Sequence, residues 1–330
     1  MITALSLLGY AACAAWCVPA LLAPLTRRGA SVRAGLAAWL TAMASVLLSA
    51  ALAIQFSLRT VAADWPQLTQ ALCRSVAGGA CTPGVYGSAF YQVGMIVLAA
   101  SLTLAGVAAA WRYGRRVQRS RAQTRSHARA ALLVGHAIAG QDRTVMLDDP
   151  RPAAYCVAGR PAAIVVTSGA LAVLDPPQLA AVLAHEGAHL AHGHHALATV
   201  TRGLAAAFPG VPLFNRGAAE VARLTEMAAD DTATRSSGRP ALVSALIAIA
   251  TGAAVASTVF SSVAFSSTGI PGGAAPAGAM AAAARAVPDR VERLLRPSSP
   301  GRSAAFTAAL TLALTVLAAA PPALTLLVAR

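Results

Sequence analysis

Four long apolar runs restrict the folds open to this chain more than any other feature of its sequence. They cover approximately residues 2–25, 36–58, 91–111 and 304–328. Each run approaches the ~20 residues that an α-helix needs to cross a bilayer. Charged residues make up 12% of the chain, against about 25% in an average soluble domain. The sequence therefore predicts a multi-span α-helical membrane protein with four transmembrane helices.

The acidic residues mark a separate soluble domain. Of the 12 acidic residues, none precedes Asp64, and the other eleven lie between Asp142 and Glu292. An interval of ~150 residues is an ordinary size for one domain. We expect three transmembrane helices in residues 1–111, a soluble domain in residues 112–303 and a fourth transmembrane helix in residues 304–330.

The arginines orient the predicted spans, because positively charged segments next to a span stay in the cytoplasm. The segment after the first span carries Arg27, Arg28 and Arg33 and no acidic residue. A second group follows the third span: Arg112, Arg115, Arg116, Arg119, Arg121, Arg125 and Arg129. We therefore expect a multi-pass protein of the cell membrane, with its soluble domain in the cytoplasm and both termini outside.

The second arginine group could instead bind nucleic acid. It lacks interleaved aromatic residues and any recognisable binding module. It also directly follows a span, where arginines contact lipid headgroups. The lipid bilayer is therefore the expected partner of this group, and no direct binding of nucleic acid is expected.

Three other segments are less tightly constrained. Residues 59–90 should form a loop outside the cell, where Cys73 and Cys81 are either bonded to each other or free. Residues 241–265 are long enough to span, but a crossing would place the arginines that follow outside. A buried or membrane-lying helix is therefore favoured. Residues 269–284 are rich in Gly, Pro and Ala and predict a loop.

The soluble domain begins with a sheet. β-type segments at residues 144–147, 154–157 and 163–167 predict a small antiparallel sheet, after a helical stretch near residues 128–139. The edge strand of such a sheet can pair with an extended peptide, but the sequence does not identify which strand that is. Cys156 is expected to be a reduced thiol in the core.

Helices follow the sheet. A helix should begin after Asp175, its N-cap, with proline in its first turn, and run through Gly193 towards Phe208. Residues 211–216 predict a loop, and a new helix is expected near Gly217. Strands followed by helices make this an α+β domain.

The first of these helices contains the pattern His-Glu-x-x-His at residues 185–189. Residues four apart project from one face of a helix, so His185 and His189 can bind one metal ion through their imidazole nitrogens. Glu186 is offset from this face and can act as a general base toward water. The pattern predicts a catalytic Zn²⁺ site with His185 and His189 as ligands and Glu186 as the catalytic residue.

A catalytic zinc needs a third protein ligand, and His195 is one candidate. It lies six residues after His189, which is the metzincin spacing, but that pattern requires glycine where His192 stands. On an unbroken helix His195 would point about 120° away from His189. The fit to the metzincin pattern is therefore poor.

Glu226 is the favoured third ligand, because a carboxylate supplied by a second helix is the gluzincin solution. Asp230 lies one turn later on the same face and can accept the outer N–H of a ligating histidine. Glu220 is a competing carboxylate on the same helix. The other histidines of the cluster are then expected on the helix surface: His192, His194 and His195.

Three segments together resemble the integral-membrane gluzincins: residues 184–195, 208–214 and 226–231. The similarity is greatest to the BlaR/MecR-type antirepressor peptidases, in a short form without a sensor domain, and the HtpX-type membrane proteases are related. Because the sequence stops at Arg330 without a penicillin-binding sensor domain, β-lactam sensing is not expected.

The resemblance covers roughly residues 140–235 and implies a cytoplasmic zincin domain of the α+β class. It implies His185, His189 and Glu226 as zinc ligands and Glu186 as the base. Many gluzincins stabilise the oxyanion with a downstream His or Tyr, which this sequence lacks. The groups that could serve instead are Zn²⁺ itself, Asn215, Arg235 and Arg239.

The sequence thus predicts a zinc metalloendopeptidase that cleaves a cytosolic or membrane-associated protein, with a transcriptional repressor as one substrate class. One alternative is HtpX-like quality control of membrane proteins. Another is a non-enzymatic membrane protein that binds metal through its histidine cluster. A homodimer is compatible with each of these functions.

Overall fold

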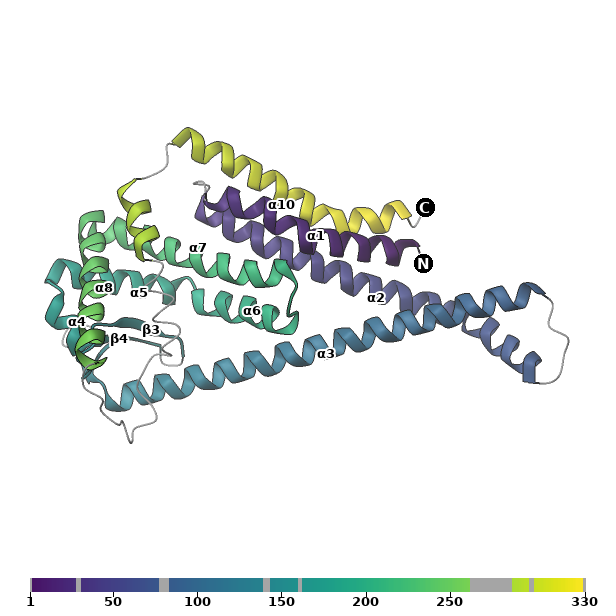
Figure 1. Ribbon diagram of the computed structural model, residues 1–330, viewed down its shortest axis with the longest axis horizontal. Helices are drawn as coiled ribbons and strands as arrows, with labels where there is room; N and C mark the ends of the chain where they lie inside the picture. Colours follow the sequence, from purple (N-terminus) through teal and green to yellow (C-terminus); the bar gives the residue numbers. More distant parts are fainter. Residues whose placement is uncertain are drawn as a thin grey trace.

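The computed structural model describes residues 2–27, 31–76, 83–138, 143–159, 162–261, 287–296 and 300–328. Within these residues, four helices are long and apolar enough to cross a membrane, which confirms the predicted spans. They are α1 (Ile2–Arg27), α2 (Val32–Val76), α3 (Pro83–Val134) and α10 (Pro300–Val328). In Figure 1, α1, α2 and α10 lie side by side, whereas α3 diverges from them and reaches the soluble domain.

Helices α2 and α3 extend beyond their apolar runs. The loop expected at residues 59–90 is wrong, since α2 continues to Val76 and α3 begins at Pro83. Helix α3 also continues past Trp111 to Val134 and absorbs most of the separate helix expected near residues 128–139. The second half of α3 is rich in arginine, alanine and glutamine, which are strong helix formers. The helix therefore does not end where its apolar run ends.

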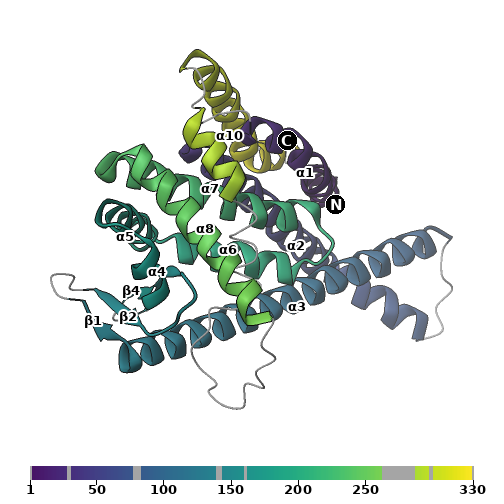
Figure 2. The same cartoon turned by 60° about the vertical axis from the view of Figure 1, so that its left-hand side comes forward.

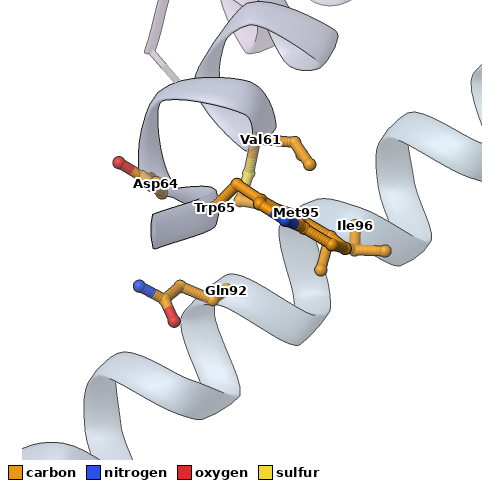
Figure 3. Close-up of a pocket in the computed structure, with 6 residues that line it drawn as sticks. All are labelled: Val61, Asp64, Trp65, Gln92, Met95 and Ile96. Atoms are coloured by element: carbon orange, nitrogen blue, oxygen red, sulfur yellow. The ribbon is translucent and has the colours of Figure 1, made fainter. Parts of the chain in front are cut away.

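Apolar side chains join α2 to α3. Trp65 of α2 packs beside Met95 and Ile96 of α3 (Figure 3), and together with Val61 and other neighbours they line a cavity of about 10 Å³. That volume holds about one water molecule. The contact is therefore helix packing and not a ligand site.

The sheet has the strands that the sequence predicts but a different topology. Its strands are β1 (His136–Ala137), β2 (Thr144–Leu147), β3 (Ala154–Val157) and β4 (Ala163–Thr167), in the order β1-β2-β4-β3. The antiparallel sheet that we expected is in fact mixed, because β4 pairs with β2 in parallel and with β3 antiparallel. All five residues of β4 are buried, so this most apolar strand takes a central position.

Five helices follow the sheet along the chain, and of these α4 and α5 pack against its strands. They are α4 (Ser168–Val173), α5 (Pro176–Ala191), α6 (His194–Ala207), α7 (Pro212–Ser237) and α8 (Arg239–Ser261). Figure 2 shows the sheet beside α5, near the end of α3. Helix α5 begins as expected. Asp175 Oδ1 accepts a hydrogen bond from Gln178 N at 2.8 Å, and Gln178 Oε1 accepts one from Asp175 N at 3.1 Å. This reciprocal capping box fixes the start of the helix.

Two helix boundaries differ from the prediction. Helix α5 does not run through Gly193, because that glycine adopts a left-handed conformation, with φ of 64°, and separates α5 from α6. The loop expected at residues 211–216 is also wrong, since α7 begins at Pro212. Proline is well suited to a first helical position, and the next two residues, Leu213 and Phe214, are buried.

Helix α8 packs within the soluble domain. The sequence left it open whether residues 241–265 cross the membrane. Within this helix, Arg239–Gly252 is an apolar stretch. The described part of α8 contacts α5 and α7, and Leu242 is 1% exposed. The loop expected at residues 269–284 lies outside the described residues, and so does Cys81, the candidate partner of Cys73.

Helix α7 joins the soluble domain to the membrane helices. Its residues Leu213, Phe214, Val221 and Leu224 share one apolar core with α1, α2 and α10. Near this core, Glu220 accepts hydrogen bonds from Arg27, at the end of α1, at 2.9 Å, and from Arg223 at 2.7 Å. Glu220 is thus a buried structural carboxylate.

The crowding around Gly217 gives a test of this junction. A Cβ at position 217 would collide with Met43 Cε and lie 3.2 Å from Trp39 Cε3. Overpacking of this kind costs about 1–3 kcal/mol and is partly offset by the about 0.5–1 kcal/mol that alanine gains over glycine inside a helix. Gly217→Ala should therefore have a lower unfolding temperature than Gly114→Ala, measured on the purified protein in detergent. Gly114→Ala is the matched control, because a Cβ there meets nothing within 4 Å. It should leave stability unchanged or raise it by about 0.5–1 kcal/mol. Equal stability of the two variants would contradict the packing of α7 against α2.

Candidate metal centre

Helices α5 and α7 pack against each other and bring three metal-ligating side chains together. His185 Nε2 and His189 Nε2, both from α5, are 3.1 Å apart. Glu226, from α7, places one carboxylate oxygen 3.5 Å from His185 Nε2 and the other 3.4 Å from His189 Nε2. One ligand atom from each residue lies within 4.8 Å of the others. The i and i+4 spacing of the histidines makes this possible, because both side chains leave the same face of α5.

The two other candidates for the third metal ligand, Glu220 and His195, lie away from this group. Glu220 is engaged with Arg27 and Arg223. The ring of His195 is 6.4 Å from that of His189, and its Nε2 lies 3.1 Å from the Cys156 sulfur. Among the described residues, His185, His189 and Glu226 are the group whose ligand atoms converge. Two imidazole nitrogens and one carboxylate form a donor set that suits a transition-metal ion and leaves a coordination position open.

Asp230 lies behind the first histidine. Its Oδ1 is 3.1 Å from His185 Nδ1, the ring nitrogen that faces away from Glu226. Asp230 is fully buried, with 0% of its surface exposed. A carboxylate in this position fixes the tautomer and the orientation of the histidine ring.

Arg290 is the part of the site that sequence reasoning missed. It is 7% exposed and lies on a short helix of residues 287–295. Its Nε donates to Asp230 Oδ2 at 2.9 Å, its Nη2 donates to Asp230 Oδ1, and its Nη1 lies 3.3 Å from Glu226. The adjacent carboxylates of Asp230 and Asp231 indicate that positively charged side chains lie nearby. Nothing in the sequence selects Arg290 from the 26 arginines.

Burial and the ion pairs set the charges in the site. Burial disfavours the charged ring of His185, but hydrogen bonds to Asp230 and Glu226 outweigh it and raise the pKa to about 9. Burial lowers the pKa of His189 to about 3. Burial also opposes ionisation of Glu226 and Asp230, yet contacts with His185 and Arg290 bring each carboxyl pKa down to about 2. Both carboxylates are therefore charged at neutral pH and suited to hold a cation.

The surface position expected for His194 is wrong, and His195 is half-buried. Because Gly193 breaks the helix, α6 turns back towards the site. His194 is 5% exposed, and its Nδ1 lies 3.0 Å from His189 Nδ1. Burial lowers the pKa of His194 to about 4. His192 is exposed, as expected. Cys156 carries a buried free thiol, as expected, and burial raises its pKa.

The ligand group opens into a cavity of about 480 Å³. Glu186 lines this cavity, with Ala154, Tyr155 and Cys156 of β3 on one side and apolar residues of α8 on another. Burial raises the pKa of the Glu186 carboxyl, although the charge on His185 opposes this. The suggested oxyanion groups Asn215, Arg235 and Arg239 are exposed. Of the described arginines, Arg202 and Arg290 line the cavity instead.

Strand β3 presents a free edge to the cavity. It is the last of the described strands in the sheet, beside β4. Thr167 N donates to Ala153 O at 3.0 Å, and Tyr155 is opposite Val165 in the antiparallel register. Because hydrogen-bonded and non-hydrogen-bonded pairs alternate, the amides of Ala154 and Cys156 point away from β4. Both β1 and β3 are edge strands of the described sheet, and β3 is the one that lies beside the cavity.

Fold and site together define an integral-membrane protein with a His-Glu-x-x-His helix and a second helix that contributes a glutamate. The chain belongs to peptidase family M48, whose sequence profile matches residues 115–296. A protease HtpX homolog from Acidiphilium cryptum (strain JF-5) is 42% identical over 67 residues. The aligned part is 20% of this chain and only 23% of that relative.

No solved structure matches the chain. The relationship to HtpX-type proteases that the sequence motifs implied is confirmed. The comparisons give no support for a closer relationship to the BlaR/MecR-type peptidases.

The buried Arg290–Asp230 pair leads to a test of stability. Arg290→Met should lower the free energy of unfolding by about 3–5 kcal/mol, because it leaves the Asp230 charge buried without its cation. Arg293→Met is the matched control on the same short helix. Its partner Asp231 is 39% exposed, so the loss should be below about 1 kcal/mol. Both values are measured by chemical unfolding in detergent with a chelator present. Equal losses in the two variants would contradict the buried pair.

Proposed function

We propose that this protein is a zinc-dependent membrane endopeptidase that cleaves cytosolic or membrane-associated proteins. The observation that carries the proposal is the convergence of His185, His189 and Glu226 beside the free edge of β3. A metal-ligand group supports hydrolysis, and a free strand edge supports binding of an extended peptide. Membership of peptidase family M48 agrees with both.

Zinc is the metal that this donor set fits best. Two histidines and one glutamate are a common ligand set of catalytic zinc, with the remaining position left for water or substrate. When bound, Zn²⁺ lowers the pKa of water and polarises a peptide carbonyl. His185, His189 and Glu226 would hold the ion, and Asp230 would hold the ring of His185.

Glu186 is the general base of the proposed reaction. It follows His185 on α5, and its carboxylate lines the cavity. Its raised pKa brings the carboxylate closer to the basicity needed to take a proton near neutral pH. Glu186 removes a proton from the attacking water and then delivers it to the nitrogen of the leaving amine.

The substrate backbone pairs with β3. The outward amide of Ala154 faces the cavity edge, whereas that of Cys156 contacts the Glu186 carboxylate. An extended peptide can therefore add to the sheet beside Ala154 as a further strand. This places its carbonyls along the side of the cavity that Glu186 also lines. Main-chain pairing of this kind needs no free terminus, which suits an endopeptidase.

The catalytic domain lies in the cytoplasm close to the membrane. Arginines at the end of α1 and along the second half of α3 support this orientation. Glu226 is six residues, or ~9 Å of helix, from Glu220, which pairs with Arg27 at the end of α1. Residues 112–303 then form the peptidase domain, residues 1–111 and 304–330 hold the spans, and both termini are outside.

Quality control of membrane proteins is the favoured role. The similarity to a protease HtpX homolog supports it, and so does the short distance between the site and the end of α1. A single repressor remains the rival substrate. The two roles differ in the number of substrates that the protein cleaves in the cell.

Glu186→Gln separates metal binding from catalysis. The variant keeps the three proposed ligands but lacks the base, so it should retain zinc and lose at least ~10²-fold in cleavage rate. Zinc content is measured by elemental analysis, and cleavage is measured with an unfolded protein in detergent. Glu292→Gln, at an exposed carboxylate, should behave as wild type. Wild-type cleavage by zinc-loaded Glu186→Gln would exclude the proposed mechanism.

The same pair of proteins identifies the substrates. New N-termini in cells that produce the wild type, but not Glu186→Gln, report cleavage sites. Quality control predicts many sites in membrane proteins, whereas repressor cleavage predicts one site in one protein.

Ala154→Pro tests substrate pairing with β3. Proline removes the outward N–H of residue 154 without removing a hydrogen bond to β4, and proline is tolerated on edge strands. Loss of one hydrogen bond of about 0.5–1.5 kcal/mol should lower kcat/KM about 3- to 10-fold. Ala154→Val keeps the N–H and is the control. If the two variants cleave equally well, the peptide does not pair with this edge.

A further inference from the structure

The two histidines of the proposed zinc site each have a partner on the outer ring nitrogen. His185 Nδ1 contacts Asp230, and His189 Nδ1 contacts His194 Nδ1 at 3.0 Å. The first contact is the usual carboxylate–histidine arrangement. The second contact joins two imidazole rings and has no role in the reaction proposed above.

The chemistry of imidazole determines how this second contact works. A neutral ring has one N–H donor and one acceptor nitrogen. His189 Nε2 faces His185 and Glu226, so in the zinc-bound site that nitrogen uses its lone pair for the metal. His189 Nδ1 must then carry the proton. His194 Nδ1 must accept it, with its own proton on Nε2.

We propose that His194 is a positioning residue for zinc, which accepts the Nδ1–H hydrogen bond of His189 and so fixes its tautomer and ring orientation. This inference rests on the proposed function, because it requires His189 to be a ligand. His194 itself is not a ligand, since it contacts the side of the His189 ring that faces away from Glu226.

The turn at Gly193 makes the contact between His194 and His189 possible. On a continuous helix, residue 194 would point about 140° away from residue 189. The left-handed Gly193, with φ of 64°, ends α5 and starts α6 at His194, which returns the side chain to the site. His194 is buried, and the ring of His192 stacks on it with centroids 5.6 Å apart. The contact therefore depends on a backbone turn and not on helical periodicity.

The test compares two replacements of nearly the same shape in the full-length protein. His194→Asn keeps an acceptor oxygen, whereas His194→Leu has a similar branched side chain without an acceptor. Zn²⁺ affinity is measured by competition with a chelator of known affinity, in detergent. His194→Leu should bind Zn²⁺ 10- to 100-fold more weakly than wild type, as is typical when such a partner is lost. His194→Asn should stay within about 5-fold of wild type.

Each outcome has a distinct meaning. His136→Leu, at an exposed histidine of β1, is the control and should bind Zn²⁺ as wild type does. If His194→Asn and His194→Leu bind Zn²⁺ equally well, or are weakened equally, His194 has only a packing role and the inference is wrong while the proposed function stands. A wild-type protein that binds no Zn²⁺ overturns both.

Discussion

The pairing of Arg290 with Asp230 is the interaction on which the arrangement of the site depends. Asp230 is fully buried, and a buried carboxylate is stable only when it is paired and hydrogen-bonded. Arg290 meets this need from a separate short helix, and His185 contacts the same carboxylate. Asp230, on α7, thus contacts both α5 and the helix of residues 287–295. Because Arg290 also contacts Glu226, the pair fixes the carboxylate that faces both histidines.

Helix α7 carries this arrangement to the membrane. Its first half shares a core with α1 and α2, and its second half holds Glu226 and Asp230. A rigid helix transmits position along its length, so any tilt of α7 against the membrane helices would move Glu226 relative to α5. The buried Glu220, held by Arg27 and Arg223, limits such a tilt. Packing of α7 against α1 and α2 therefore fixes the position of the site relative to these two helices.

Those parts of the fold and of the site that follow local rules could be predicted from the sequence. Helical spacing predicts that His185 and His189 share a face, and strand propensity predicts the residues of β2, β3 and β4. Strand order and the partner of Asp230 could not be predicted, since burial of β4 and the position of Arg290 are long-range effects. The surface position expected for His194 is wrong for a local reason, because it assumed a helix that continues through Gly193. The left-handed conformation of Gly193 changes the direction of the chain, and helical periodicity does not predict it.

The charges around the proposed ligands His185 and His189 explain why the two histidines have different partners. With His185 neutral, as metal binding requires, Glu186, Glu226 and Asp230 contribute three negative charges when ionised. Arg290 contributes one positive charge, which leaves a surplus of two negative charges. Such a surplus is costly in a buried site, and a divalent cation balances it. A second carboxylate in place of His194 would upset this balance, whereas a neutral imidazole accepts the same hydrogen bond without adding charge. The site thus uses a charged partner, Asp230, for His185, where Arg290 compensates the charge, and a neutral partner, His194, for His189.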